Sequence, residues 1–306
     1  MTISAKIICD SISPHNVRLT TMLLRYPRFV HAEFMTHRVF SRNASSSRAI
    51  PIEKMIQAVL DEPAMPIHWG KNQKGMQAGE ELSLSEIEHA KRGWREAMME
   101  AVDNARMLNE LGLHKQIVNR VLEPFSHITV VVTATEWNNF LHLRDHEDAQ
   151  PEIAELARQC RVELELSDPV PLEYGQWHLP FIDLKSEYPV VERLCQVGRV
   201  TRDMPKPAEV YDVLIKMSAA RCARTSYLTH DKKNPTIDED VALYERLVGG
   251  VPLHASPTEH QATSDTWNKG DFEGYGAKWN NPHLHGNLTG WMQHRKFLHN
   301  ENVTTR

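Results

Sequence analysis

Runs of β-branched and apolar residues predict three strands in the first half of the chain. Residues 6–10 (KIICD) form a short apolar run, and in residues 17–26 (VRLTTMLLRY) every second side chain would share one face. Residues 127–135 (HITVVVTAT) are β-branched along much of their length. Such a run is typical of a buried strand.

Apolar residues at helical spacing occupy much of the remaining chain. They predict helices at residues 28–40, 52–62, 83–112, 114–122, 136–164 (one helix or two), 211–224 and 237–248. In the first of these, Val30, Phe34 and His37 are spaced i, i+4 and i+7, so an apolar stripe would end on a histidine. Ser83 and Glu86 have the capping-box spacing that begins a long helix.

Polar, proline-rich and glycine-rich stretches predict the irregular parts. The serine-rich residues 41–50 predict a loop, and residues 63–82 predict a connection. Residues 165–207 are rich in proline, lack a sustained period and predict an irregular excursion. Residues 263–290 predict an ordered loop, and residues 291–306 predict a last helix with a polar tail. Because no stretch has the composition of a linker, we expect the whole chain to form one domain.

Composition and charge restrict the class of protein. The hydrophobic fraction of 41% and the charged fraction of 25% are ordinary for a globular α/β or α+β protein. The net charge of -5 argues against a protein that follows a nucleic-acid backbone, although a small anionic ligand needs only a local arginine cluster. No apolar stretch approaches the length of a membrane span, and the first residues do not resemble a signal peptide. We therefore expect a cytoplasmic protein that binds neither nucleic acid nor membranes.

The cysteines and histidines do not predict a metal site. Cys9, Cys160, Cys195 and Cys222 are far apart and form no CxxC pair. The 17 histidines include no HExxH pattern. We expect reduced, mostly buried thiols and no metal ion.

Residues 37–48 (HRVFSRNASSSR) carry the strongest candidate for chemistry. Guanidinium groups, hydroxyls and an amide would converge where the predicted helix meets the loop. That combination suits a phosphate or a heteroaromatic ring with several polar edges. On composition alone, a solvated serine-rich loop remains an equal alternative.

The pattern HRxxSxNxxSxR in residues 37–48 resembles the signature of flavin-dependent thymidylate synthases. Residues 27–38 (PRFVHAEFMTHR) are similar to the helix that precedes it in that family. The resemblance extends to residues 114–124 (HKQIVNRVLEP) and 136–153 (EWNNFLHLRDHEDAQPEI). It therefore covers most of the predicted elements of the first half of the chain.

Two later blocks resemble elements that usually precede the signature. Residues 220–227 (ARCARTSY) are similar to the family's A-R-V-S-Y, and residues 253–260 (LHASPTEH) to its H-x-[ST]-P-x-E-H. The resemblance implies an α+β fold with helices packed around a twisted mixed sheet, in circularly permuted or duplicated order. It also implies a single catalytic domain over residues 1–306 and a homotetramer with shared active sites.

The resemblance assigns roles to individual residues. The nucleotide-binding residues would be Ser46, Arg48, Arg120 and Arg144, of which Arg48 and Arg144 would be catalytic. The flavin-binding residues would be His37, Arg38, Asn43, Asn139, Ser226, His254 and Ser256.

Three positions depart from the family pattern. Thr36 stands where an arginine is usual, Ala44 where an acidic residue is usual, and Glu33 where a glutamine is usual. Residues 290–301 repeat a His-Arg pair with an asparagine six residues beyond the histidine, which is either an echo of the signature or a coincidence. We hypothesise that Arg295 and Glu301 supply the missing groups.

The resemblance implies that FAD, reduced by NADPH, serves the transfer of a one-carbon unit from methylenetetrahydrofolate to C5 of dUMP, which gives dTMP. Two alternatives stay open. One is flavin- or folate-dependent hydroxymethylation of dUMP or dCMP, which the departures at Thr36 and Ala44 favour. The other is a non-catalytic regulator that binds a nucleotide or a flavin.

Overall fold

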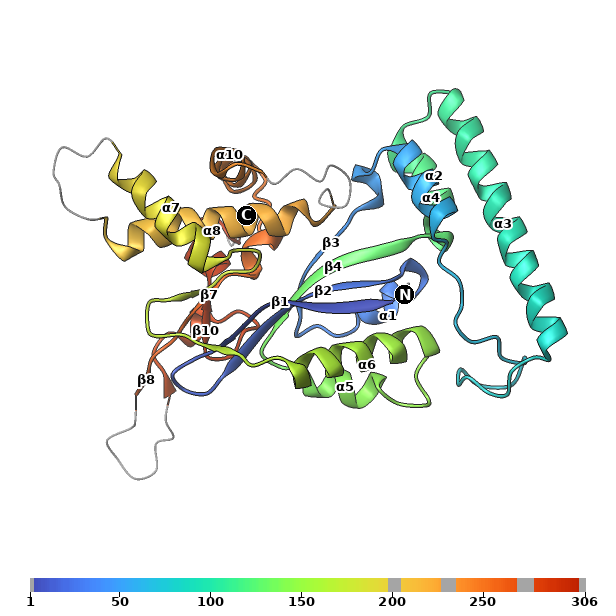
Figure 1. Ribbon diagram of the computed structural model, residues 1–306, viewed down its shortest axis with the longest axis horizontal. Coiled ribbons are helices and arrows are strands. Elements are labelled where there is room, and N and C mark those ends of the chain that lie inside the picture. Colours follow the sequence, from blue (N-terminus) through green and yellow to red (C-terminus); the bar gives the residue numbers. More distant parts are fainter. Residues whose placement is uncertain (1–2, 198–204, 227–234, 269–277, 303–306) are drawn as a thin grey trace.

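A five-stranded sheet forms the centre of the protein (Figure 1). The computed structural model describes residues 3–197, 205–226, 235–268 and 278–302. The strands lie in the order β3-β4-β2-β1-β5; β5 runs parallel to β1, and the other neighbours are antiparallel. They are β1 (Ser4–Ile12), β2 (Arg18–Pro27), β3 (Ser41–Ala44), β4 (His127–Ala134) and β5 (Val170–Pro171). The chain is therefore an α+β protein with a mixed sheet, as the sequence predicted.

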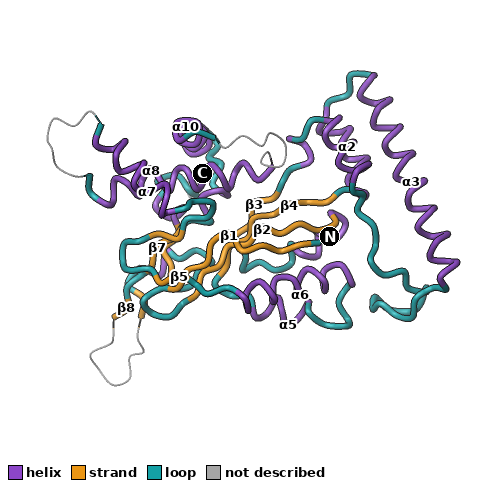
Figure 2. The backbone as a smooth tube through the Cα atoms, viewed as in Figure 1, coloured by secondary structure: helices purple, strands orange, loops and turns teal. Residues whose placement is uncertain are grey.

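The helices lie in three groups around this sheet (Figures 1 and 2). α5 and α6 cover one face, where Ile153 and Leu156 join the core of the strands. α2, α3 and α4 pack on one another at one end of the sheet, and α7 and α8 pack together at the other end, with α10 beside α8. The helices are α1 (His31–Phe34), α2 (Ile52–Asp61), α3 (Leu84–Glu110), α4 (Lys115–Leu122), α5 (Asn138–Arg144), α6 (Pro151–Leu166), α7 (Leu184–Gln196), α8 (Pro207–Ala223) and α10 (Ile237–Val248).

Short elements of the second half cover the other face of the central sheet. A three-stranded sheet has the order β10-β7-β6, and β8 pairs with β9. These strands are β6 (Trp177–His178), β7 (Ala262–Ser264), β8 (Trp267–Asn268), β9 (Lys278–Trp279) and β10 (Trp291–Gln293).

Short 3-10 helices connect elements in both halves of the chain. They are η1 (Arg28–Val30), η2 (Ser47–Ala49), η3 (Glu123–Phe125), η4 (Arg224–Ser226), η5 (Ser256–Glu259), η6 (Pro282–Leu284) and η7 (His294–Phe297).

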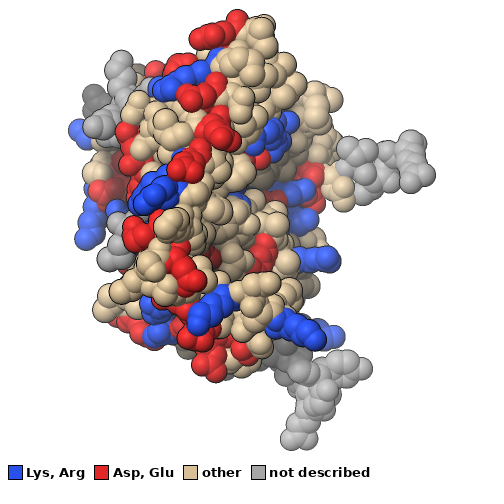
Figure 3. Space-filling model, turned by 90° about the vertical axis from the view of Figure 1, so that its right-hand side faces the viewer, with Lys and Arg blue, Asp and Glu red and all other residues tan. Residues whose placement is uncertain are grey.

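The long helix α3 begins at the predicted capping box. The Ser83 backbone N–H donates to a Glu86 carboxylate oxygen at 2.9 Å. On α3, Lys91 Nζ lies 3.1 Å from Glu88 Oε1. On the face shown in Figure 3, acidic and basic side chains are interspersed. This face lacks the single-sign basic stripe that follows a nucleic-acid backbone.

The helix predicted at residues 28–40 is wrong beyond Phe34. The Thr36 hydroxyl donates to the Glu33 carbonyl at 2.7 Å, a local bond that competes with helix continuation. His37 therefore lies in a turn. The loop predicted at residues 41–50 is also wrong in part, because residues 41–44 form β3 and satisfy the outer edge of β4.

Two predictions in the second half are also wrong. The excursion predicted at residues 165–207 contains α7, which begins where the Asp183 side chain accepts from the Lys185 backbone N–H at 3.1 Å, and which continues through Pro189. The helix predicted from residue 291 is instead β10 followed by the short η7. Cross-strand partners far away in the sequence stabilise β10, so the sequence of the segment itself contains little indication of its extended form.

A row of small side chains crosses four strands of the central sheet. Cys9 lies opposite Thr21, Thr21 opposite Thr133, and Thr133 opposite Ser41. Since directly opposed residues of antiparallel strands share a face, all four side chains point the same way. Thr21, Thr133 and Ser41 are buried, so their hydroxyls require hydrogen-bond partners.

Residues of the second half bind this polar row. His178 Nε2 lies 2.8 Å from the Thr21 hydroxyl, and His260 Nδ1 lies 2.8 Å from the Thr133 hydroxyl. The two threonine hydroxyls are 2.6 Å apart. Gln293 Nε2 donates to the Ser41 hydroxyl at 3.1 Å. The polar row thus joins the two halves of the chain.

Burial governs the protonation of both histidines in this row. It lowers the pKa of His178 and the pKa of His260 to about 3. Both rings are neutral at pH 7, and each can donate through only one nitrogen.

The helices in the described part of the chain are all too short or too polar to cross a lipid bilayer.

We expect the free energy of unfolding to decrease as the pH falls from about 6.5 toward 3. A histidine in the unfolded chain has a pKa near 6.5, whereas the pKa values of His178 and His260 in the folded protein are about 3. Between these two pH values the unfolded state therefore binds more protons than the folded state, so lowering the pH favours unfolding. Each histidine contributes a slope of about 1.4 kcal/mol per pH unit within that window. Urea unfolding at pH 7, 6 and 5 measures the change.

His89→Gln serves as the control, because His89 is exposed on α3, and it should leave the slope unchanged. Equal free energies of unfolding at pH 7 and pH 5 would contradict the interpretation.

Candidate active site

Asn43 on β3 connects the signature segment to both later blocks. Its side-chain N–H group donates to the Cys222 carbonyl at 2.7 Å, and its carbonyl oxygen accepts from the Ser256 hydroxyl at 3.3 Å. These partners are 179 and 213 residues away in the sequence. The structure thus brings together the three segments that the sequence singled out.

Ser41 ties the same strand to the C-terminal segment. Its hydroxyl donates to Asn287 Oδ1 at 3.1 Å, and the Asn287 amide donates to the Val39 carbonyl at 2.7 Å. Gln293 also bonds to the Asn287 oxygen. Sequence reasoning missed Asn287, which lies outside every motif, and Gln293, which directly precedes the His-Arg pair of residues 290–301 but is not part of its pattern.

Arg144 at the end of α5 lies against the turn that contains His37. Its Nε donates to His37 Nε2 at 2.9 Å, and its guanidinium forms an ion pair with Glu33. A third contact, at 3.5 Å, reaches the Thr36 hydroxyl. Arg144 therefore contacts two of the three positions that depart from the family pattern, Glu33 and Thr36.

The contact with Arg144 fixes the state of His37. Burial, with Arg144 and then Arg42 adding positive charge, lowers the pKa of His37 to about 4. Since Nε2 accepts from Arg144, the proton of the neutral ring lies on Nδ1. His37 can offer a ligand an N–H donor and no positive charge.

Arg48 and Arg120 lie on elements that pack together. Arg48 is in η2, which contacts α4, and Arg120 is in α4. Both side chains are exposed; Arg120 pairs with Glu123 at 3.0 Å, and Arg48 makes no ion pair with any described residue. The Ser47 hydroxyl donates to the same Glu123 carboxylate at 2.5 Å.

Two further cations hold the backbone of this segment. Lys115 Nζ donates to the Ala49 carbonyl at 3.1 Å, and the Arg28 guanidinium donates to the Ser45 carbonyl at 3.3 Å. Two cations, Lys115 and Arg28, and one carboxylate, Glu123, thus contact residues 45–49. The sequence patterns had not indicated Lys115 or Arg28.

Other predicted residues lie apart from these contacts. Arg38, Asn139 and His254 have exposed side chains, and no hydrogen bond or ion pair joins those side chains to a described residue. Ser46 is half-buried in the turn between β3 and η2. The side chain of Ser226 and all of Tyr227 lie outside the described part of the chain.

Arg295 and Glu301 bind each other. The Arg295 Nε donates to a Glu301 carboxylate oxygen at 2.9 Å, and Arg295 also forms an ion pair with Glu259. Among the described residues, neither contacts Thr36 or Ala44 directly. The ion pair between Arg295 and Glu259 brings Arg295 and Glu301 close to the block 253–260.

A cavity of about 410 Å³ adjoins the signature segment. Ser45 and Ile50 contribute to its wall, together with residues of α2 and β4 and with Thr225 from the second half. Its volume is within the range of small-molecule sites. None of the predicted site residues lines it.

In the described part of the chain, no group of three or more His, Cys, Asp or Glu side chains is arranged to hold a metal ion.

Comparisons with known proteins place this geometry in a class. The fold is that of an α+β protein, and the class of enzyme follows from a family match. The sequence profile of the thymidylate synthase complementing protein matches residues 12–170, just over half of the chain. The chain belongs to that family. No curated protein sequence matches it.

Solved structures show a weaker likeness. Two of them are of the UMP/dUMP methylase PolB from Streptomyces cacaoi, one bound with 5-Br UMP and the other with 5-Br dUMP. Each is 18% identical to this chain with a TM-score of 0.45. The match covers 53% of this chain and 88% or 89% of the methylase. At these values the likeness assigns no ligand to this protein.

We expect Asn43→Ala to lower the free energy of unfolding by about 1 to 3 kcal/mol, because two hydrogen bonds that join distant segments are lost. Asn139→Ala is the matched control, since its exposed amide should contribute less than about 0.5 kcal/mol. Chemical denaturation of both variants measures the difference. Equal stability of the two variants would show that the Asn43 contacts do not hold the segments together.

Proposed function

We propose that the protein transfers a one-carbon unit from methylenetetrahydrofolate to C5 of dUMP, giving dTMP, with FAD as cofactor and NADPH as reductant. The observation that carries the proposal is the position of Asn43 between the Cys222 carbonyl and the Ser256 hydroxyl. Three segments that resemble the family's flavin and nucleotide elements meet there. Membership of the thymidylate synthase complementing family supports the same activity.

The charges around residues 45–49 fit a phosphate. Arg48 and Arg120 are exposed side chains on adjoining elements, and Lys115 and Arg28 add positive charge behind them. Ser46 lies beside these cations in the chain and supplies a hydroxyl. Guanidinium groups bind phosphate through charge-assisted hydrogen bonds, so Ser46, Arg48 and Arg120 would hold the 5′-phosphate.

Arg144 fits a role at the pyrimidine ring. Its contacts with Glu33, His37 and Thr36 use three of the five guanidinium N–H donors, so donors remain for a ring carbonyl. A cation there would stabilise negative charge that develops on the ring during alkylation. Glu33 and His37 act as positioning residues, because both hold the guanidinium.

Some of the residues assigned to the flavin have side chains available to bind it, and Asn43 does not. Arg38, Asn139 and His254 have exposed side chains available to a ligand, and His37 offers an Nδ1–H donor. The amide of Asn43 is occupied by Cys222 and Ser256, so it would shape the site through those segments. Bound flavin would supply the electron transfer, and these residues would bind and orient it.

Chain order and assembly complete the proposal. We infer a circularly permuted order, supported by the contacts of residues 220–226 and 253–260 with β3. A homotetramer with shared sites would let exposed residues such as Arg38 and His254 complete a neighbour's site. Arg295 and Glu301 would support that site through Glu259.

Hydroxymethylation of dUMP or dCMP is the second candidate. The ion pair between Arg144 and Glu33 favours its dCMP form, because Glu33 introduces a carboxylate near the proposed pyrimidine site. A carboxylate can accept from an exocyclic amino group such as that of cytosine.

We expect the purified protein, after addition of FAD, to show a flavin absorbance band and to oxidise NADPH. With methylenetetrahydrofolate and dUMP it should release dTMP, identified by mass spectrometry. A hydroxymethylated product from dUMP or dCMP would select the second candidate. Bound FAD without NADPH oxidation would indicate a regulator, and absence of any flavin band would refute the proposal.

Arg48→Ala and Arg38→Ala should separate the two ligands. Loss of a phosphate contact at Arg48 should weaken dUMP binding by about ten- to a hundredfold and leave FAD affinity unchanged. Arg38→Ala should weaken FAD binding and leave dUMP affinity unchanged. Titration calorimetry measures both, with Arg106→Ala on α3 as the control. The assignments fail if both variants affect both ligands equally.

A further inference from the structure

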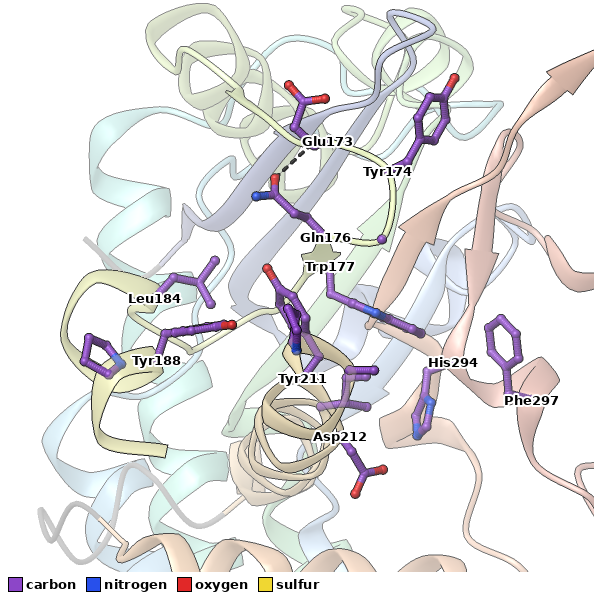
Figure 4. Close-up of a pocket in the computed structure, with 15 residues that line it drawn as sticks. Glu173, Tyr174, Gln176, Trp177, Leu184, Tyr188, Tyr211, Asp212, His294 and Phe297 are labelled. Carbon is purple, nitrogen blue, oxygen red and sulfur yellow. Dashed lines mark hydrogen bonds between the residues drawn. The ribbon is translucent and has the colours of Figure 1, made fainter. Parts of the chain in front are cut away.

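A second cavity, of about 1030 Å³, lies in the part of the chain beyond the family match (Figure 4). Its wall comes from the loop that leads into β6, from α7 and α8, and from η7. The volume is at the upper end of the range of small-molecule sites. The proposed catalytic function does not use this cavity.

Aromatic rings form much of its wall. Tyr188 and Tyr211 pack edge to face, with ring centroids 5.7 Å apart. Trp177 contacts Phe297 at 6.0 Å and His294 at 6.1 Å. Figure 4 shows the tyrosine pair on one side and Trp177, His294 and Phe297 on the other. Rings held in this way offer flat surfaces on which another ring can stack.

Polar groups with spare hydrogen-bonding capacity face the same space. The hydroxyls of Tyr188 and Tyr211 have no hydrogen-bond partner among the described residues, although Tyr211 is only 9% exposed. Burial raises the pKa of Tyr211, so its hydroxyl stays protonated and can donate. Gln176 accepts from the Glu173 backbone N–H at 2.8 Å, which fixes its side chain and leaves its amide N–H groups for a ligand.

The charge of the described wall is unfavourable for a phosphate. Among the described residues, the lining contains no lysine or arginine, whereas Glu173 and Asp212 are acidic. Asp212 is paired with Lys216 at 3.1 Å, and Glu173 is exposed at the rim. Burial lowers the pKa of His294 to about 4, so this ring adds no positive charge.

We propose that this cavity binds a flat heteroaromatic ring that carries an exocyclic amino group and no phosphate. The rings of Trp177 and Tyr211 would stack on the ligand, and Glu173 would accept from its amino group. Tyr211 and Cys222 are eleven residues apart on α8, or about 16 Å along the helix, so this site is distinct from the junction at Asn43. The proposal is independent of the proposed catalytic function.

Titration calorimetry with three probes tests the ligand chemistry. Adenosine and 6-hydroxymethylpterin both carry the amino-substituted ring, and AMP adds a phosphate to the first. We expect at least one of the two phosphate-free probes to bind, and its identity distinguishes a purine from a pterin ligand. AMP should bind at least tenfold more weakly than adenosine if adenosine is the better probe. AMP binding as tight as adenosine binding would overturn the proposal, as would no binding of either phosphate-free probe.

Two variants locate the binding. Tyr211→Phe removes one hydroxyl with little change in packing and should lower the affinity for the probe by about two- to tenfold. Trp177→Leu removes a stacking surface and should weaken it by at least tenfold. Trp69→Phe, in the connection between α2 and α3, is the control and should change nothing. Circular dichroism checks that each variant is folded. Unchanged affinity in a folded Tyr211→Phe together with a folded Trp177→Leu would overturn the assignment to this cavity.

Discussion

The polar row of Cys9, Thr21, Thr133 and Ser41 is the constraint on which the arrangement of the two halves depends. It crosses the sheet on the face opposite α5 and α6. A buried hydroxyl without a partner costs free energy, so this face cannot be covered by apolar residues alone. His178, His260 and Gln293 meet that requirement from the second half of the chain. Neutral histidines suit this role, because a charged imidazole would be costly at such depth.

The same register positions the candidate active site. Asn43 lies two residues beyond Ser41 on β3, so both side chains point to the face that the second half covers. The bonds of Ser41 to Gln293 and Asn287 set the distance between that half and the strand. Asn43 then reaches the Cys222 carbonyl and the Ser256 hydroxyl. A slip of one residue would turn Ser41 and Asn43 toward the apolar core.

Electrostatics divides the proposed site into two parts. Around residues 45–49, Arg28, Lys115 and the exposed arginines contribute positive charge, and Glu123 balances part of it. Around Arg144, the charge is balanced by Glu33, and burial keeps His37 neutral. The first part suits a phosphate, and the second suits an uncharged ring with directional polar edges.

The sequence determined the elements whose stability is local or strongly patterned. The buried run at β4, the strand pattern at β2 and the capped helix α3 occur close to where the sequence predicted them. The motif in residues 37–48 also identified the segment at the centre of the candidate site. In these cases periodicity, β-branched residues and capping groups act over a few neighbouring positions, so the signal is contained in the segment itself.

Only the tertiary structure decided the rest. β3 is a strand because β4 needs a partner, and β10 is extended because β7 lies beside it. The contact of Arg144 with Glu33, and that of Asn43 with Ser256, join residues more than 100 positions apart. No local pattern encodes such pairs, since their energy comes from burial and from charges that meet only after the chain has folded. Residues 41–44, the first part of the segment predicted as a loop, therefore form an edge strand, and their chemistry depends on the half of the chain that covers them.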